Sequence, residues 1–258
     1  MKLISLNIWG GKIYQPLLSF IEDQSKTTDI FCFQEILRSN SSISESSGYK
    51  TNVLSDLTNI LKDFNGYFAK TFNGYDMVKL VDFNLDFGIA IFVKKPVTVM
   101  LHKEALIHHV NKGVVRRDGY YETSRGIQSI QIKFDNKIFN IYNLHGIWTP
   151  DFEGGKEDNE DKLKQSRKIE QFMQKDIGGK ILAGDFNLNP DTRSLKILEK
   201  NLKNLIKEYR VKTTRSSFYT RKYKFADYIL VSPEIEIIDF KVPNIAVSDH
   251  LPMILEFF

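Results

Sequence analysis

The chain has 258 residues, of which 42% are hydrophobic and 26% are charged, and its net charge is +4. This composition is typical of a folded globular protein and excludes a disordered chain, and no apolar run is long enough to span a bilayer. Cys32 is the single cysteine, which excludes an intrachain disulfide and argues against a cysteine-ligated zinc site. The N-terminus lacks the apolar stretch of a secretory signal, so we expect a cytoplasmic protein without membrane contact.

Short apolar runs typical of strands alternate with helix-like segments along the whole chain, which predicts an α/β fold in a single domain over residues 1–258. The last expected helix has Asn189 as its N-cap and Pro190 in its first turn. In chain order the expected elements are strand 3–8, helix 14–24, strand 30–34, helix 53–64, strands 87–93, 127–134 and 138–144, helix 162–175, strand 181–184, helix 191–200, and strands 228–231, 235–241 and 253–257.

Polar side chains stand at or just after the ends of these strands. In the segment GDFN, Asp185 and Asn187 follow a buried strand and would share one side of an extended chain. Each such residue alone has an ordinary structural explanation as a turn or cap, but burying many charges together is costly unless something compensates them. A cluster around a divalent cation would compensate them. The residues concerned are Asn7, Gln34, Glu35, His145, Asp185, Asn187, Asp227, Asp249 and His250.

The types of side chain in this set indicate the cation and the reaction. Carboxylate and amide oxygens without thiolates favour a hard ion, Mg²⁺ with Mn²⁺ as the alternative, over zinc. A hard cation, a carboxylate that activates water and two imidazoles around the substrate are typical of phosphate ester hydrolysis.

Two segments have a strongly biased charge. Residues 207–224 contain seven Lys or Arg against one Glu, interleaved with aromatic residues. This mixture suits a polyanion with bases to stack on, and it suits a solvated loop and edge strand equally well. Residues 151–161 contain six acidic residues and one Lys, which would repel a polyanion, hold a cation or form a solvated turn.

The ordered segments SLNIWG, FQEI, NLHG, GDFN, ADYILVS and SDHLP resemble the endonuclease/exonuclease/phosphatase superfamily of deoxyribonuclease I-like metal-dependent phosphoesterases. The resemblance implies a four-layer sandwich, with two central mixed β-sheets flanked by helices and the site at one edge of the sheets. It also implies that Glu35 is the principal metal ligand, that Asn7 lies beside it, and that Asp249 belongs to the inner or outer shell of the ion.

The same resemblance implies the catalytic roles. Asp185 would activate or position the attacking water, and Asn187 would orient the scissile phosphate. His250, paired with Asp227, would stabilise charge on the phosphate or act as the base. His145 would hydrogen-bond the phosphate or assist the leaving oxygen, and in-line attack with inversion at phosphorus would follow.

Departures from the family pattern narrow the activity. Members that act on abasic DNA carry Tyr where this chain has His145, and the residues 224–226 before Asp227 lack the Arg common in exonuclease III-like members. Both departures argue against the DNA-repair branch. Asp86 is the nearest candidate for an acidic partner of His145, and Arg125 is expected either to clamp phosphate or to form a surface ion pair.

These residues together predict a Mg²⁺-dependent phosphodiesterase that acts on nucleic acid or nucleotides and needs no obligate protein partner. One alternative keeps the same core but hydrolyses a phospholipid or a small phosphomonoester such as an inositol phosphate, and another is a non-catalytic binding module. Trp9 and Trp148 are expected to anchor loops by burial, with the mouth of the site as the alternative.

Overall fold

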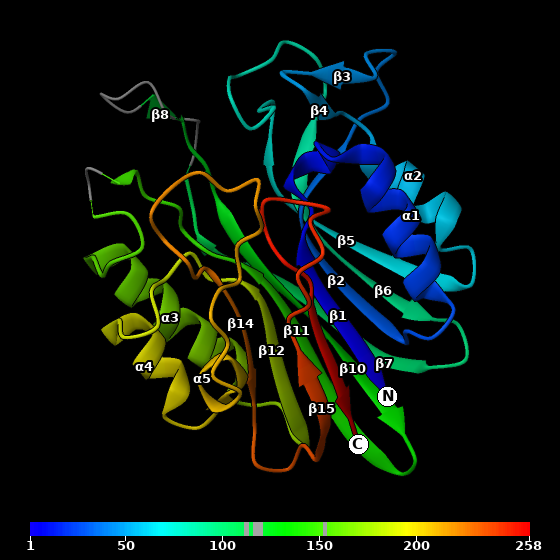
Figure 1. The fold of residues 1–258 in the computed structure, drawn as a ribbon, viewed down its shortest axis with the longest axis vertical. Helices are drawn as coiled ribbons and strands as arrows, with labels where there is room; N and C mark the ends of the chain where they lie inside the picture. The colour runs from blue at the N-terminus through cyan, green and yellow to red at the C-terminus, as the bar shows by residue number, and fades with distance from the viewer. Residues whose placement is uncertain (111–113, 116–120, 152–153) are drawn as a thin grey trace.

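A computed structural model describes residues 1–110, 114–115, 121–151 and 154–258. Two six-stranded mixed β-sheets face each other at the centre, and helices cover the outer face of each (Figure 1). The predicted α/β four-layer sandwich is therefore confirmed. Both chain ends lie at the end of the sandwich opposite to the one where β1 (Lys2–Asn7) finishes.

The two sheets have related layouts, each with a parallel pair of strands inside an otherwise antiparallel order. The first consists, in spatial order, of β15 (Ile237–Lys241), β16 (Met253–Phe257), β1, β2 (Ile30–Arg38), β6 (Asp86–Lys94) and β5 (Phe64–Asn73). The second consists of β13 (Lys203–Asn204), β14 (Asp227–Val231), β12 (Gly179–Asp185), β11 (Lys137–His145), β10 (Arg125–Phe134) and β7 (Thr98–His108).

The helices divide between the two outer faces, α1 and α2 on the first sheet and α3 to α5 on the second (Figure 1). Within the described ranges no helix combines the length and apolarity that a membrane crossing requires. The remaining elements are η1 (Trp9–Gly11), α1 (Tyr14–Ser25), β3 (Glu45–Ser46), β4 (Tyr49–Lys50), α2 (Val53–Ile60), β8 (Val114–Val115), β9 (Tyr121–Glu122), α3 (Glu160–Met173), α4 (Arg193–Glu199) and α5 (Leu205–Glu208).

Two hydrophobic cores explain why the sequences of the central strands are continuous apolar runs. On β1, Leu3 belongs to the core between the sheets, whereas Ile4 and Leu6 pack under the helices of the first sheet. Successive strand side chains point to opposite faces, so a strand covered on both faces needs apolar residues at every position. Full burial of each such side chain contributes roughly 1.5–3 kcal/mol to stability. Cys32 is buried in the core between the sheets.

A polar contact inside this core ties the two sheets together. Gln34 Nε2 on β2 donates to Asn143 Oδ1 on β11 at 2.7 Å. Asn143 Nδ2 in turn donates to the backbone oxygens of Phe33 and Ala90, each at 3.0 Å. Gln34 therefore belongs to the packing between the sheets and not to the polar cluster with which the sequence grouped it.

The structure corrects three element assignments. The edge strands β5 and β7 were not predicted, because their half-exposed side chains break the apolar runs that mark central strands. The helix expected over residues 53–64 ends at Ile60, and Phe64 already begins β5. The N-cap of α4 is Thr192, which accepts from Leu195 N at 3.3 Å, so the assignment of Asn189 as N-cap is wrong.

Candidate active site

Strand register places the predicted residues at one end of the two sheets. His145 is paired with Asp185 across the parallel strands β11 and β12, and Asp185 is paired with Asp227 across β12 and β14. Loops from both sheets close around this row and leave a cavity of about 760 Å³. The predicted residues that line the cavity are Glu35, Arg125, Asp185, Asn187, Asp249 and His250, whereas Asn7, His145 and Asp227 are buried beneath them.

A β-bulge turns Glu35 into the cavity. The register between β2 and β6 shifts between Phe33 and Ile36, and Glu35 has a φ of +58°. A positive φ is unfavourable for a residue with a side chain, and such strain concentrates at functional sites. Burial, reinforced by the carboxylate of Asp249, raises the pKa of Glu35 to about 7. The site therefore holds more negative charge than its protein surroundings compensate.

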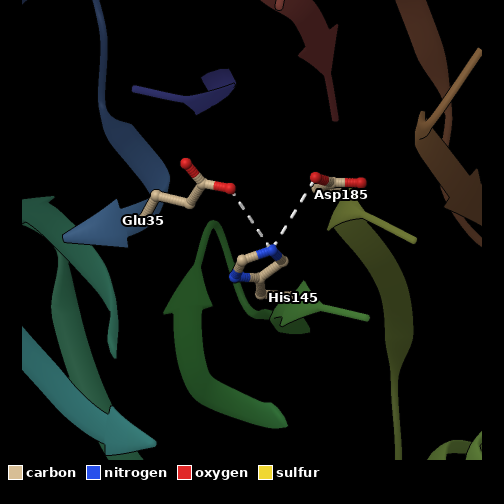
Figure 2. Close-up of side chains that lie close together, drawn as sticks. All are labelled: Glu35, His145 and Asp185. Atoms are coloured by element: carbon tan, nitrogen blue, oxygen red, sulfur yellow. Dashed lines mark ion pairs between the residues drawn. The ribbon is translucent and has the colours of Figure 1, made fainter. Parts of the chain in front are cut away.

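His145 lies between the carboxylates of Glu35 and Asp185, which come from different strands and both point towards its ring (Figure 2). Its Nε2 is 3.7 Å from Glu35 Oε1 and 3.8 Å from Asp185 Oδ2. Arg125 Nη1 lies 3.1 Å from the same ring nitrogen. Burial first, and then Arg125, lower the pKa of His145 well below its ordinary value. The ring is therefore neutral near pH 7, and the two carboxylates approach it without forming ion pairs.

Asp185 is held rigidly by two hydrogen bonds. Asn7 Nδ2 donates to its Oδ2 at 3.0 Å, and the backbone N–H of Asn187 donates to its Oδ1 at 2.9 Å. Burial alone would raise the pKa of Asp185, but nearby cationic groups, above all His250 and Lys156, outweigh burial and lower it. Asp185 is therefore an ionised acceptor fixed in one orientation.

The sequence predicted that the chain stays extended from Asp185 through Asn187. The structure corrects this prediction. The strand ends at Asp185, and Asn187 has a φ of +54°. Asn187 Nδ2 donates to Gly146 O at 3.1 Å, and its Oδ1 accepts from Lys156 Nζ. Gly146 has no room for a side chain, because a Cβ there would lie 2.4 Å from Phe186 O. This close backbone approach keeps the turn around Asn187 against the strand end that carries His145.

His250 and Asp227 form the predicted pair. His250 Nδ1 lies 2.8 and 2.9 Å from the two carboxylate oxygens of Asp227, and both side chains are buried. Burial and the neighbouring Arg215 lower the pKa of His250, but three carboxylates outweigh both and raise it overall: Asp227, Asp249 and Asp185. Arg215 Nη1 contacts His250 Nε2, so in the neutral ring that nitrogen accepts and the proton lies on Nδ1, facing Asp227.

Two cationic residues of the site were not identified from the sequence. Lys156 is buried against Asn187, although it is the single Lys of the acidic segment 151–161. Phe152 and Glu153 of this segment lie outside the described residues. Burial, and after it the charge of Arg215, lower the pKa of Lys156 to about 7. Arg215 comes from the basic segment, and its Nη1 donates to Asp249 Oδ2 at 3.2 Å.

The basic segment does not contain the edge strand considered from the sequence. Residues 209–226 form a loop, and residues 218–221 of this loop line the cavity. Part of this loop is therefore a wall of the cavity, whereas the basic residues Arg210, Lys212, Lys222 and Lys224 are exposed to solvent.

Three other sequence predictions have clear outcomes. Arg125 lines the cavity against His145, which excludes the alternative of a purely surface ion pair. Asp86 is not the partner of His145, because its carboxylate accepts from Arg38 Nε at 3.1 Å and from Asn73 Nδ2 at 2.9 Å. Both tryptophans, at positions 9 and 148, border the cavity and are only half-buried, which favours the mouth of the site over simple anchoring.

The oxygen-rich side of the cavity fits a divalent cation. Glu35 and Asp249 supply carboxylates: burial, and after it the charge of Asp249, raise the pKa of Glu35, although Arg215 already neutralises part of the charge on Asp249. Asn7 Oδ1 accepts from Trp9 N at 3.0 Å and keeps a second lone pair. No thiol lies in this group, since the one cysteine is buried in the core. Such a donor set suits Mg²⁺ or Mn²⁺ better than a soft ion.

Comparisons with known proteins agree with this architecture. The model of a family described as "Endonuclease/Exonuclease/phosphatase family" matches residues 4–250. A search of curated proteins gave no match.

Solved structures resemble the whole chain. A family protein from Leptotrichia buccalis C-1013-b has a TM-score of 0.70 at 19% identity, covering 100% of this chain and 99% of that one. A mannosyl-6-phosphatase from Bacteroides thetaiotaomicron VPI-5482 has a TM-score of 0.69 at 16% identity, with coverages of 100% and 99%. The human Nocturnin catalytic domain with bound sulfate has a TM-score of 0.67 at 17% identity, with coverages of 100% and 94%. At these identities the likenesses show the fold.

Proposed function

We propose a function for this chain, which belongs to the endonuclease/exonuclease/phosphatase family of divalent-metal-dependent phosphoester hydrolases. The proposal is that it hydrolyses phosphodiester bonds in nucleic acid or nucleotides, with Mg²⁺ as its ion. One observation carries the proposal: residues remote in sequence meet at a single cavity with carboxylate, imidazole and amide groups in contact. These residues are Glu35, His145, Asp185, Asn187 and His250.

Three groups of the chain act on the attacking water and on the phosphate. Asp185 is ionised and fixed, so it accepts a hydrogen bond from the water and orients it, or takes its proton. As the water oxygen bonds to phosphorus, the bond from phosphorus to the leaving oxygen breaks on the opposite side. His250 Nε2 lies 3.8 Å from Asp185 Oδ2, so the imidazole and the carboxylate act on the same part of the cavity. Asp227 stabilises the charged imidazole.

Donors on the other side of the cavity bind the phosphate. Asn187 offers its amide nitrogen, and His145, which is neutral, donates to a phosphate oxygen or to the leaving oxygen. Arg215 lines the cavity, so its guanidinium brings positive charge to a bound phosphate. Arg125 also faces the cavity and adds a second guanidinium. A planar guanidinium matches phosphate geometry well.

The metal would be held by Glu35, Asp249 and Asn7. A bound Mg²⁺ or Mn²⁺ supplies Lewis-acid polarisation of the phosphate and neutralises part of its charge. The pKa of Glu35, raised to about 7 by burial and then by Asp249, supports this assignment because a cation removes the repulsion between the two carboxylates.

The wall of the cavity supports a substrate that carries bases. Trp148, Phe218 and Tyr219 line it, and the guanidinium of Arg221 lies 5.3 Å from the ring of Trp148. Aromatic side chains next to cationic ones are how proteins hold unpaired bases, at about 1–3 kcal/mol per stacked base.

A small phosphomonoester is the second candidate, and the size of the cavity favours it. A volume of about 760 Å³ lies within the range of about 300–1,000 Å³ that is usual for small-molecule sites. One of the similar solved structures is described as a mannosyl-6-phosphatase. A sugar phosphate would use the same phosphate donors and would stack on the rings without needing a base.

One assay separates these possibilities. Bis-p-nitrophenyl phosphate and mono-p-nitrophenyl phosphate are compared with and without Mg²⁺, followed by single- and double-stranded oligonucleotides, sugar phosphates and sphingomyelin liposomes. The proposal expects EDTA-sensitive turnover of the diester, with Asp185→Asn nearly inactive. Preference for the monoester or for a sugar phosphate would reverse the ranking of the two candidates. Failure to hydrolyse any phosphoester in the presence of Mg²⁺ or Mn²⁺ would refute both.

A further inference from the structure

Lys156 is a buried cation that the proposed chemistry does not use. Its side chain is 3% exposed, and its Nζ contacts Asn187 Oδ1. Lysine is among the residues least often fully buried, because desolvation of the ammonium is costly. Here the carboxylates of Asp185 and Asp227 act on it electrostatically and offset part of that cost.

The loop that carries Lys156 is fastened on two sides. Lys162, which is also buried, donates its Nζ to the backbone oxygens of Gly155 and Glu157, the residues on either side of Lys156. The backbone oxygen of Lys156 accepts from Asn189 N at 2.9 Å, two residues after Asn187. The ammonium is therefore fixed relative to Asn187 by the fold.

The end of the same loop is built into two helices. Asp158 accepts from the backbone N–H groups of Arg193 and Ser194 at 2.6 and 2.9 Å, at the start of α4. Asn159 caps α3 by accepting from Lys162 N at 2.9 Å. Asp158 and Asn159 thus fasten the acidic segment to α3 and α4, while Glu157, Glu160 and Asp161 are exposed to solvent.

The contact between Lys156 and Asn187 determines which way the carboxamide faces. An ammonium donates hydrogen bonds and cannot accept them, so the amide oxygen of Asn187 must face Lys156. The amide nitrogen then lies on the other side, where one of its hydrogens is donated to Gly146 O and the second remains for a ligand in the cavity. With an apolar side chain at position 156 the amide would keep only the support of Gly146 O in this arrangement, and an acceptor at position 156 would oppose it.

We propose that Lys156 is a positioning residue, which holds the Asn187 carboxamide so that its N–H group, and not its oxygen, faces the phosphate of the substrate. This inference rests on the proposed function, because it assumes that a phosphate binds next to Asn187. Lys156 acts through Asn187 and does not itself touch the reacting atoms. A reversed amide would place an oxygen lone pair against phosphate oxygens, and the resulting repulsion would weaken both binding and turnover.

The test compares Lys156→Met, which removes the donor, with Lys156→Gln, which keeps a neutral N–H donor, and combines each with Asn187→Ala. Hydrogen bonds that involve charged groups contribute enough for Lys156→Met to lower kcat/KM by about 10- to 100-fold. Lys156→Gln should stay within about threefold of the wild type. In the Asn187→Ala background, Lys156→Met should change kcat/KM by less than about threefold, because the group that it orients is gone.

A matched control and a second measurement guard against simple misfolding. Lys103→Met removes a half-buried lysine that donates to Asp176 at 2.6 and 2.7 Å, away from the cavity, and should leave kcat/KM unchanged. Calorimetric titration with inorganic phosphate should show weaker binding by Lys156→Met and no further loss when Asn187→Ala is added. Equal losses for Lys156→Met and Lys156→Gln would overturn the inference, as would additive losses with Asn187→Ala.

The phosphate titration also separates the two proposals. If the wild type binds phosphate but hydrolyses no phosphoester, the proposed function fails, and the coupling between positions 156 and 187 still decides the inference. The inference is refuted if the wild type binds no phosphate at millimolar concentration. It is also refuted if a crystal structure of Lys156→Met shows the Asn187 amide in its original orientation and the phosphate affinity is unchanged.

Discussion

Replacement of Asp227 by Asn probes the pair with His250 most directly. The substitution keeps an oxygen that can accept from His250 Nδ1, but it removes the negative charge that lies 2.8 and 2.9 Å from that nitrogen. Both residues are buried, so water does not screen the lost charge. Any change in rate therefore reports the charge of Asp227 and not the presence of an acceptor.

The expected size of the effect follows from this contact. A hydrogen bond to a charged group contributes about 1.5–3 kcal/mol, and each 1.4 kcal/mol is a factor of ten in rate. Asp227→Asn should therefore lower kcat by about 10- to 150-fold. Asp227 is the first of the three carboxylates that raise the pKa of His250, so its neutralisation should lower that pKa. Any limb of the pH–rate profile that reports His250 should then move to lower pH, since Asp249 and Asp185 compensate only in part.

The assay is the initial rate of bis-p-nitrophenyl phosphate hydrolysis at saturating Mg²⁺ from pH 5 to pH 9. Asp176→Asn serves as the control, because Asp176 is a half-buried carboxylate that accepts from Lys103 and from Tyr142 at 2.8 Å, away from the cavity. The control should lose thermal stability and keep its kcat and its pH profile. A folded Asp227→Asn variant with the kcat and the pH profile of the wild type would refute the role given to the pair.

Three further predictions concern the metal, the backbone and the substrate. With EDTA, Glu35 should lower the free energy of unfolding by about 3 kcal/mol between pH 5 and pH 8, because a pKa raised to about 7 means that the folded state holds the proton more tightly. Urea titrations should show a fall that is larger by this amount in the wild type than in Glu35→Gln, and equal slopes would contradict the prediction. Gly146→Ala should lower the melting temperature and kcat together, because the Cβ of the new alanine would collide with Phe186 O. A variant with the melting temperature and rate of the wild type would exclude the close approach of these two backbone segments. Trp148→Ala should raise KM for a nucleotide substrate about tenfold with kcat kept, and an unchanged KM would exclude stacking on this ring.

The central strands could be predicted from short stretches of sequence, each taken by itself. The runs over residues 3–8, 30–34 and 181–184 are apolar at nearly every position because both faces of each sheet are covered, and this periodicity identified them as strands. The polar residues that follow them were identified for the same reason: a carboxylate or an imidazole directly after a buried strand stands out against apolar neighbours. The edge strands β5 and β7 have no such signature, since one face or edge is exposed and polar residues are tolerated there.

What the tertiary structure decided is which charges meet. Gln34 and Glu35 are adjacent in sequence, yet the bulge in β2 directs Gln34 to the core and Glu35 to the cavity. Lys156 and Arg215 lie in segments whose composition left several roles open, solvated charge among them, and both are buried beside catalytic candidates because distant elements fold over them. The pattern of apolar residues in the sequence depends on one element and on whether its faces are covered by other elements. The position of a long cationic side chain depends instead on how several loops pack together. The sites of such cations could therefore be determined only in the folded chain.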